Sequence, residues 1–440
     1  MPRAQQLGRY HLLDRIAFGG MAEIYRAKTF DERGEQHIVA VKRVLGHLAE
    51  DDDFVQMLVD EAKICGTLRH PNIAAIYEFA RSGEDYFIAM EYVDGKDSRT
   101  ILDRCRQLGR TIPAQHCGYI AWQVAEALEA AHTQHDGLGR AMRIIHRDIS
   151  PSNLLCSYTG EVKLCDFGIA KATLSRVQTK TGVIKGKVKY MSPEQAMGRK
   201  LDHRSDLFSL GTVLYELLTG HAPFQAPSEM ELLFRVRDAK YRPLHELLPT
   251  VPNRLEAVVE RALQRARSAR FQSAREMGDA LRGFLTHDAP RYKRSHMGRF
   301  LRDLFAEEIE HELRRMEAYV VHPGDATQVG ENLIADVLGP DAMFRRFSPV
   351  AGDFHASPTQ LPTRAFPRIE DNKLPTGRDM HTIETVILDR NRAPTRASGR
   401  PRRRILDAAF HQADTKIIRV RESDARSTSS PRTPSRPRKP

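Results

Sequence analysis

Long apolar runs and paired cysteines are both missing from this 440-residue chain. No stretch of about 18 consecutive apolar residues occurs, so we expect no transmembrane helix. The first six residues lack the apolar core of a secretory signal peptide. The cysteines are odd in number and scattered, and none belongs to a Cys-x-x-Cys pair, which argues against a zinc site or a disulfide framework. They are Cys65, Cys105, Cys117, Cys156 and Cys165. A reducing cytoplasm is the compartment that fits this pattern best.

The charge balance is basic, with a net charge of +11 and an isoelectric point near 9.5. Such a balance can indicate nucleic-acid binding, but the chain has no zinc-ligand spacing, helix-turn-helix pattern or aromatic stacking platform. Basic residues instead gather near the end of the chain, at residues 400–404 and 431–440. We therefore expect a solvated basic tail rather than a nucleic-acid site, with electrostatic docking of acidic partners as the next alternative.

Two short motifs are the most informative feature that is present. The sequence His-Arg-Asp-Ile-Ser-Pro-Ser-Asn occupies residues 146–153, and Asp166-Phe167-Gly168 follows thirteen residues after Asn153. They supply two carboxylates, Asp148 and Asp166, and one amide, Asn153. Carboxylate and amide oxygens are hard ligands of the kind that Mg²⁺ prefers. Two such motifs in this order and at this separation are typical of a phosphoryl-transfer site.

The region before these motifs has features that suit phosphate binding. Residues 39–42 alternate as a strand that ends in Lys42, and residues 54–68 have helical apolar spacing and carry Glu61. We expect Glu61 to be the partner of Lys42. A turn of small residues between two strand-like runs would let backbone N–H groups approach phosphate oxygens. This turn and its flanks consist of Ile16, Ala17, Phe18, Gly19, Gly20, Met21, Ala22, Glu23 and Ile24.

With these motifs in place, residues 10 to about 287 resemble the bacterial Hanks-type serine/threonine protein kinases, in the group with Gly-Gly-Met in the glycine loop. The resemblance continues through residues 90–95, which match the hinge that receives adenine, and through residues 190–194 and 202–207. It ends at Arg270-Phe271, where the family's Arg pairs with the motif Glu, here Glu194.

The resemblance implies an α+β, bilobal protein kinase fold. A small β-rich N-lobe would span residues 10–95, and a large, mainly α-helical C-lobe would follow to about residue 287. ATP would lie between the lobes, with its adenine against the backbone of Glu91 and Val93. Lys42, held by Glu61, would place the phosphates.

The same resemblance implies the chemistry. Asn153 and Asp166 would hold Mg²⁺, with Mn²⁺ as an alternative ion. Asp148 would act as catalytic base toward a Ser or Thr hydroxyl of a protein substrate. Autophosphorylation of Thr179 or Thr181, in the activation loop, would switch the enzyme on, with Arg147 available to pair with the new phosphate.

Three departures from the family pattern weaken this assignment. Ala17 and Ala22 stand where the first and third glycines are usual, Ser150 stands where the family has a Lys, and Lys187 stands where it has a Thr. A pseudokinase or scaffold whose basic tail binds signalling partners is therefore the alternative function. In a third interpretation the tail performs the main function by binding partners, and the kinase domain regulates the tail.

The exchange of residue types at 150 and 187 suggests a compensation. In the family's geometry both positions face one point beside Asp148. We therefore predict that Lys187 reaches in from the activation segment and supplies the phosphate-binding charge that Ser150 cannot. The alternative is that Lys187 is solvent-exposed and Ser150 is merely tolerated.

Two further segments follow the kinase-like region. Residues 288–320 predict an amphipathic helix, for which we favour packing on the second lobe or self-association into a homodimer over membrane contact. Its apolar side consists of Phe300, Leu301, Leu304, Phe305, Ile309, Leu313 and Met316. Residues 321–440 are basic and rich in Pro, Ser, Thr and Arg, and we expect them to be largely disordered. Thr-Gln pairs at residues 326–329 and 358–361 suggest docking sites for a phosphothreonine-reading partner.

Overall fold

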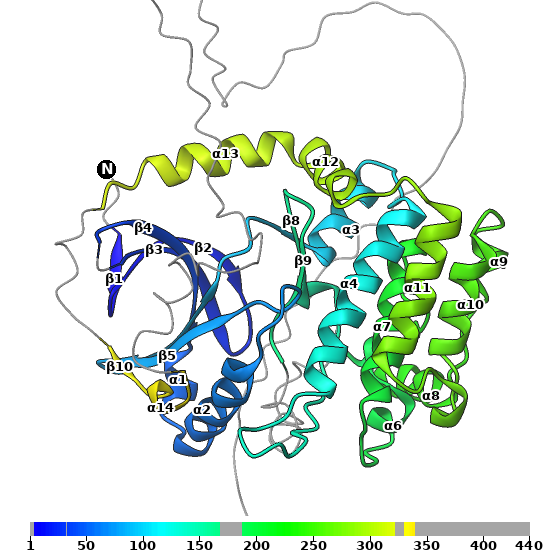
Figure 1. The fold of residues 1–440 in the computed structure, drawn as a ribbon, viewed down its shortest axis with the longest axis horizontal. Coiled ribbons are helices and arrows are strands. Elements are labelled where there is room, and N and C mark those ends of the chain that lie inside the picture. Colours follow the sequence, from blue (N-terminus) through cyan, green and yellow to red (C-terminus); the bar gives the residue numbers. More distant parts are fainter. Residues whose placement is uncertain (1–3, 32, 168–186, 322–329, 339–440) are drawn as a thin grey trace, which may run out of the picture. The chain divides into compact units, whose positions relative to one another are not determined.

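The computed structural model describes residues 4–31, 33–167, 187–321 and 330–338. These residues form a β-rich first lobe and a mainly helical second lobe, which confirms the expected α+β, bilobal fold (Figure 1). The activation-loop threonines Thr179 and Thr181 lie outside the described residues, as do the Thr-Gln pairs of the tail.

The first lobe is built on an antiparallel sheet. Among the described residues its strand order is β1-β2-β3-β4-β6-β5-β10. The strands are β1 (Gln5–Leu7), β2 (Tyr10–Phe18), β3 (Ala22–Phe30), β4 (Gln36–Val44), β5 (Ile76–Ser82), β6 (Asp85–Glu91) and β10 (Glu331–Asn332). Side chains alternate between the two faces of β4, so Val39 and Val41 are buried in one apolar cluster. Lys42 therefore points to the other face of the sheet.

Helix α2 (Asp52–Thr67) follows the short α1 (Gly46–Ala49) and packs on the sheet. The Asp51 side chain caps its N-terminus by accepting the N–H of Phe54 at 3.0 Å. Phe54 and Leu58 then pack with Phe79 of β5 in a second apolar cluster. This packing anchors the helix that carries Glu61 against the sheet.

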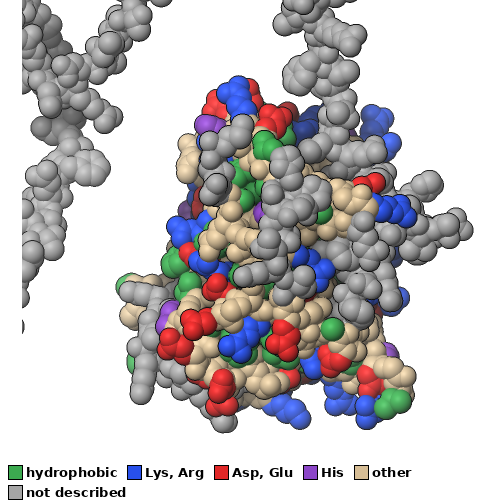
Figure 2. Space-filling model, turned by 90° about the vertical axis from the view of Figure 1, so that its left-hand side faces the viewer, with side chains coloured by type: hydrophobic (Ala, Val, Ile, Leu, Met, Phe, Trp, Pro, Cys, Tyr) green, Lys and Arg blue, Asp and Glu red, His purple; other side chains and the backbone are tan. Residues whose placement is uncertain are grey.

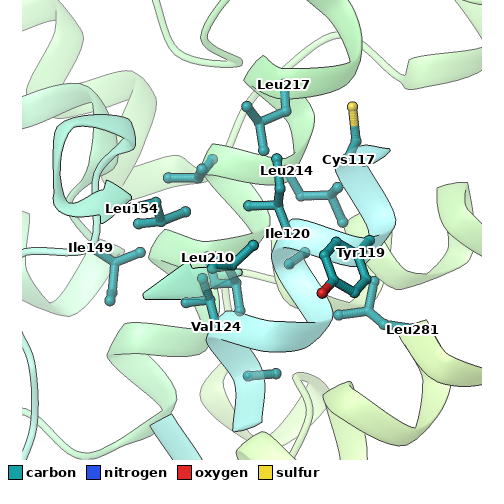
Figure 3. Packing of buried hydrophobic residues seen from close by; sticks show 14 of the residues in the cluster. Cys117, Tyr119, Ile120, Val124, Ile149, Leu154, Leu210, Leu214, Leu217 and Leu281 are labelled. Carbon is teal, nitrogen blue, oxygen red and sulfur yellow. The ribbon is translucent and has the colours of Figure 1, made fainter. Parts of the chain in front are cut away.

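The second lobe contains the largest apolar core. Its main helices are α3 (Ser98–Gln107), α4 (Ala114–His132), α6 (Pro193–Ala196), α7 (Arg204–Thr219), α8 (Glu229–Asp238), α9 (Leu244–Leu247), α10 (Asn253–Ala262) and α11 (Ala274–Asp288). Figure 3 shows Ile120 and Val124 of α4 beside Leu210 and Leu214 of α7. All four are fully buried, and each such side chain contributes roughly 1.5–3 kcal/mol relative to exposure.

A buried ion pair fixes α6 to the segment between α10 and α11. Arg270 makes two parallel hydrogen bonds to Glu194, at 2.7 and 2.8 Å, and its guanidinium lies over the ring of Phe208 at 4.8 Å. Both partners are almost fully buried, so removing either would leave an unpaired buried charge. This pairing confirms the contact expected from the sequence.

The extension after α11 forms two helices where one was expected. They are α12 (Arg294–Leu304) and α13 (Ala306–Glu317). The prediction of one continuous helix is wrong because Phe305, between them, leaves the helical region with φ −123° and buries its side chain. Met297, Leu301 and Leu304 of α12 join the second-lobe core, which confirms packing on that lobe for this half of the extension.

The structure also describes residues 330–338, which lie within the tail that the sequence predicts to be largely disordered. They form β10 and the short helix α14 (Ala335–Leu338), and β10 pairs with β5. Hydrogen bonds to a sheet edge and the burial of one apolar side chain, Ile334, hold these residues on the first lobe.

None of the described helices is both long and apolar enough to cross a membrane. All five cysteines are free thiols. Figure 2, which looks onto the first lobe, shows Lys and Arg side chains interspersed with Asp and Glu. The positive charge is therefore not gathered on the described part of this face.

The packing of His116 generates a prediction about pH. This buried ring stacks on Phe300 of α12, with centroids 4.7 Å apart, and its Nδ1 lies 2.7 Å from the Tyr292 hydroxyl. Burial, with a smaller effect of the charge on His296, lowers the pKa of His116 to about 4.

Between pH 6.5 and 4 the unfolded chain therefore holds a proton at His116 that the folded chain does not. We expect stability to fall as pH falls through this window, by up to about 3 kcal/mol from this group. His116→Phe should flatten that part of the profile, as measured by urea unfolding at pH 7 and pH 4.5. Parallel profiles for the two proteins would contradict the assignment.

Candidate active site

Lys42 meets Asp166 where the two lobes come together. In the β3–β4–β6 register Lys42 lies opposite Ile24 on one side and Ile88 on the other, so it projects from the middle of the sheet. Its Nζ lies 2.8 Å from Asp166 Oδ1. Burial alone would raise the pKa of Asp166, but the charge and hydrogen bond of Lys42 lower it. Asp166 is therefore an anion at neutral pH.

Asp148 and Asn153 are locked together on one loop. This loop leads into a small sheet of β7 (Gly95–Asp97), β8 (Leu154–Ser157) and β9 (Val162–Leu164). The amide nitrogen of Asn153 donates to the carbonyl oxygen of Asp148 at 2.8 Å and to its Oδ2 at 2.9 Å. The Asn153 carbonyl in turn accepts the N–H of Cys165 at 3.0 Å. The residue directly before Asp166 is thus tied to Asn153.

Lys187 reaches the same carboxylate. Its Nζ lies 2.6 Å from Asp148 Oδ2, although Lys187 itself is exposed. Ser150 is buried, and its hydroxyl makes no hydrogen bond within the part of the chain that the structure describes. A cation therefore faces Asp148 from position 187, whereas the residue at position 150 is a serine and carries no charge.

The glycine loop joins β2 to β3. The Gly19 N–H donates to the carbonyl oxygen of Ala22 at 2.9 Å, which closes the turn. Neither Ala17 nor Ala22 has a positive φ, so their methyl groups fit the strand backbone without strain. The side chain of Phe18 is 66% exposed at the tip. The loop therefore forms its turn without backbone strain at the two positions where alanine replaces glycine.

The flanks of this loop are held by ion pairs. Glu23 accepts hydrogen bonds from Arg15 at 2.6 Å and from Arg43 at 2.7 Å. These two bonds lower the pKa of Glu23 to about 2. Glu23 thus ties β2, β3 and β4 together beneath the loop, and Met21 packs its side chain against the cluster under α2.

The expected adenine-facing backbone begins where β6 ends. The N–H of Glu91 donates to the Ala75 carbonyl at 2.8 Å, and its side chain accepts the Ala75 N–H at 3.1 Å. Lys163 lies 2.8 Å from the other Glu91 oxygen. These contacts fix the point at which the chain leaves the sheet toward Val93. Lys163 was not singled out from the sequence.

Asp206 holds the loop that carries Asp148. Its carboxylate accepts the backbone N–H groups of His146 and Arg147, both at 2.8 Å. It also lies 2.8 Å from Nε2 of His132. Burial would raise the pKa of Asp206, but the hydrogen bond and charge of His132 outweigh it and lower the pKa. The sequence analysis placed Asp206 in a motif but did not predict that it accepts hydrogen bonds from the loop before Asp148. An acidic residue near the start of a buried helix could have indicated this role.

Two residues of this region have an unusual backbone. Arg147 has φ 65° and Asp166 has φ 56°, a conformation that costs a non-glycine residue roughly 1–3 kcal/mol. His146 supports both turns. Its ring lies 4.5 Å from that of Phe167, and Nε2 lies 3.1 Å from the Cys165 carbonyl. Burial lowers the pKa of His146, which favours a neutral ring that donates from Nε2.

One predicted contact lies outside what the structure describes. Glu61 is on α2, but its side chain is not among the described atoms, so the expected Lys42–Glu61 pair stays a prediction.

The donor set fits a metal-bound nucleotide. Asp166 offers a carboxylate, and Asn153 keeps its amide oxygen because its nitrogen makes the bonds to Asp148. Lys42 places its ammonium group beside Asp166, at the same place. Hard oxygen ligands beside a lysine are the arrangement that a divalent ion bridging nucleotide phosphates requires.

Comparison with known proteins agrees with this geometry. The model of the protein kinase domain family matches residues 10–280. The tyrosine-protein kinase MasK of Myxococcus xanthus is 39% identical over 308 residues, which cover 70% of this chain and 48% of that protein. The serine/threonine-protein kinase PrkC of Bacillus subtilis is 34% identical over 270 residues, covering 61% of this chain and 39% of that one.

A third relative, the serine/threonine-protein kinase PknB of Mycobacterium leprae, is 38% identical over 277 residues, covering 61% of this chain and 42% of that protein. The chain thus spans less than half the length of each of these bacterial relatives. The matched domain nevertheless occupies more than half of the chain and contains every described residue of the site. The chain belongs to the protein kinase family.

Proposed function

We propose that this chain transfers the γ-phosphoryl group of ATP to Ser and Thr hydroxyls of proteins. The family implies ATP and a divalent ion, and we assign Mg²⁺ to that role, with Mn²⁺ as the alternative. The observation that carries the proposal is the meeting of Lys42 and Asp166 beside the Asp148–Asn153 pair. Ser/Thr specificity is supported by the names of PrkC and PknB.

In this mechanism Asp148 orients the substrate hydroxyl and accepts its proton. The hydroxyl oxygen forms a bond to the γ-phosphorus while the bond from that phosphorus to ADP breaks. Asn153 keeps the Asp148 carboxylate in place through its two hydrogen bonds. When bound, the divalent ions offset the negative charge of the phosphates, and Asp166 and Asn153 would hold them. Lys42 would place the phosphates.

Lys187 is proposed as a catalytic residue. Its contact with Asp148 puts an ammonium group beside the position at which the γ-phosphate must arrive. A lysine head is a mobile point charge, so it can turn from the carboxylate to the phosphate. Because Lys187 belongs to the end of the activation segment, this charge would be in place only when that segment is folded.

A tyrosine kinase is the second candidate function. The name of MasK favours it, and so does the absence at Ser150 of the lysine that marks the serine/threonine family. Both candidates share the site described above, and they differ only in the acceptor hydroxyl. A pseudokinase or a scaffold that works through its basic tail remains the non-enzymatic alternative.

The first prediction about the mechanism concerns Asp148 and Lys42. Asp148→Asn and Lys42→Met should each abolish phosphoryl transfer without unfolding the protein, because the first removes the proton acceptor and the second the phosphate contact. ATP binding should survive better in the Asp148 variant, since Asp148 faces the acceptor. Transfer of ³²P to a generic protein substrate and ATP titration would measure both. Near wild-type transfer by the Asp148 variant would show that the assignment is wrong.

The second prediction concerns Lys187. Lys187→Thr should lower kcat by ~10²-fold, because one charged contact of about 3 kcal/mol is lost. Adding Ser150→Lys should restore much of the rate, since it returns a cation to the family's usual position. Ser150→Lys alone is the matched control and should keep activity. Wild-type activity in Lys187→Thr would show that Lys187 contributes nothing to phosphoryl transfer.

The third prediction concerns the acceptor. Incubation with ATP and Mg²⁺ should place phosphate on Thr179 or Thr181, and mass-spectrometric mapping would locate it. Nε of Arg147 makes no hydrogen bond to any residue that the structure describes, which leaves it able to pair with such a phosphate. Phosphate on tyrosine would favour the second candidate, and phosphate in the tail alone would count against activation-loop control.

A further inference from the structure

A segment near the end of the described chain lies on the first lobe, far in sequence from the residues that it touches. We call residues 330–338 the docking segment. Its strand β10 pairs with β5 in antiparallel register, Glu331 opposite Arg81 and Asn332 opposite Ala80. The N–H of Leu333 then donates to the Phe79 carbonyl at 2.8 Å. The segment is bound as an added edge strand, a common mode of peptide recognition.

One apolar side chain of the docking segment is fully buried. Ile334 is 0% exposed and packs in the cluster that contains Phe54 and Leu58 of α2 and Phe79 of β5. Leu333 lies against the same cluster. The pocket that receives Ile334 is thus made jointly by helix α2 and the sheet, so its occupant contacts both.

A charge pair fixes the orientation of the docking segment. Asp336 of α14 lies 2.8 Å from Nζ of Lys63 on α2. Both side chains are partly exposed, so the pair contributes more to register than to stability. Together with Ile334 it gives the segment two contacts with α2, on either side of the position that Glu61 occupies in the sequence.

The chain reaches this place by passing along both lobes (Figure 1). At the second-lobe end of α13, Glu308 pairs with Arg104 at 3.3 Å. Further along, Arg315 pairs with Asp14 of β2 at 3.6 Å. After α13, the Tyr319 carbonyl accepts from Lys28 of β3 at 2.7 Å.

We propose that the surface formed by α2 and β5 is a binding site for the docking segment of this same chain, and that its occupation holds α2 in the position required for phosphoryl transfer. The occupant matches the site in chemistry. It offers a free edge for β5, an isoleucine for the apolar pocket and a carboxylate for Lys63. The effect on activity rests on the proposed function, whereas the binding itself does not.

The experiment uses the chain of residues 1–440. Ile334→Asp should release the docking segment, because a carboxylate cannot enter the apolar pocket unpaired. Hydrogen exchange of α2 should quicken at least tenfold, and transfer to a protein substrate should fall at least tenfold. Val337→Asp is the matched control, since Val337 is 40% exposed, and it should change neither quantity by more than twofold.

A synthetic peptide of residues 330–338, labelled for fluorescence anisotropy, should bind the Ile334→Asp protein and restore both the slow exchange of α2 and the activity. The same peptide with Ile334→Asp should not bind. Exchange in α2 that is unchanged by the variant, or failure of the wild-type peptide to bind, would overturn the proposal. If the wild-type protein shows no transfer at all, the proposed function fails while exchange and anisotropy still decide the docking.

An exchange of charges between Lys63 and Asp336 provides a second test that does not depend on the folding of the Ile334→Asp variant. Lys63→Asp and Asp336→Lys should each quicken exchange in α2, and the double variant should return it to the wild-type rate. Circular dichroism and a thermal midpoint show whether each variant is folded. Equal exchange in the single and double variants would mean that Lys63 and Asp336 do not meet in solution.

Discussion

The site depends on the buried carboxylate of Asp206. The loop before Asp148 has to turn through a backbone conformation that is costly for Arg147, and two N–H groups of that turn would be unsatisfied if they had no acceptor. Asp206 accepts both, and His132 keeps it charged despite its burial. Because Asp206 lies in the first turn of helix α7, the position of Asp148 is set by the packed core of the second lobe rather than by the loop itself.

The two carboxylates of the site are each paired with a lysine. Lys42 neutralises Asp166, and Lys187 neutralises Asp148. Each carboxylate therefore has a cation from a different part of the chain, Asp166 from strand β4 of the first lobe and Asp148 from position 187. Each ion pair is complete only when the part of the chain that supplies its lysine is in place.

The sequence was sufficient to predict those contacts that follow from the spacing of residues within short motifs. The relation of Asp148 to Asn153 follows from one short loop, and the Arg270–Glu194 pair follows from the family motifs. The turn at Phe305 could not be predicted, since the apolar spacing is the same whether the helix continues or breaks. The docking segment was missed because a two-residue strand has no periodicity. Its site is built from residues such as Lys63, far from Asp336 in the sequence.

The pairing of β10 with β5 also matters before the chain is complete. An uncovered strand edge is a template for another chain, and β5 lies at the end of the sheet until β10 arrives. About 240 residues separate the end of β6 from β10. Ribosomes add ~5–20 residues per second, so the first lobe stands with an open edge for tens of seconds during synthesis. The stretch that closes this edge is made well after the lobe itself, so during synthesis the edge of β5 is open to pairing with another chain.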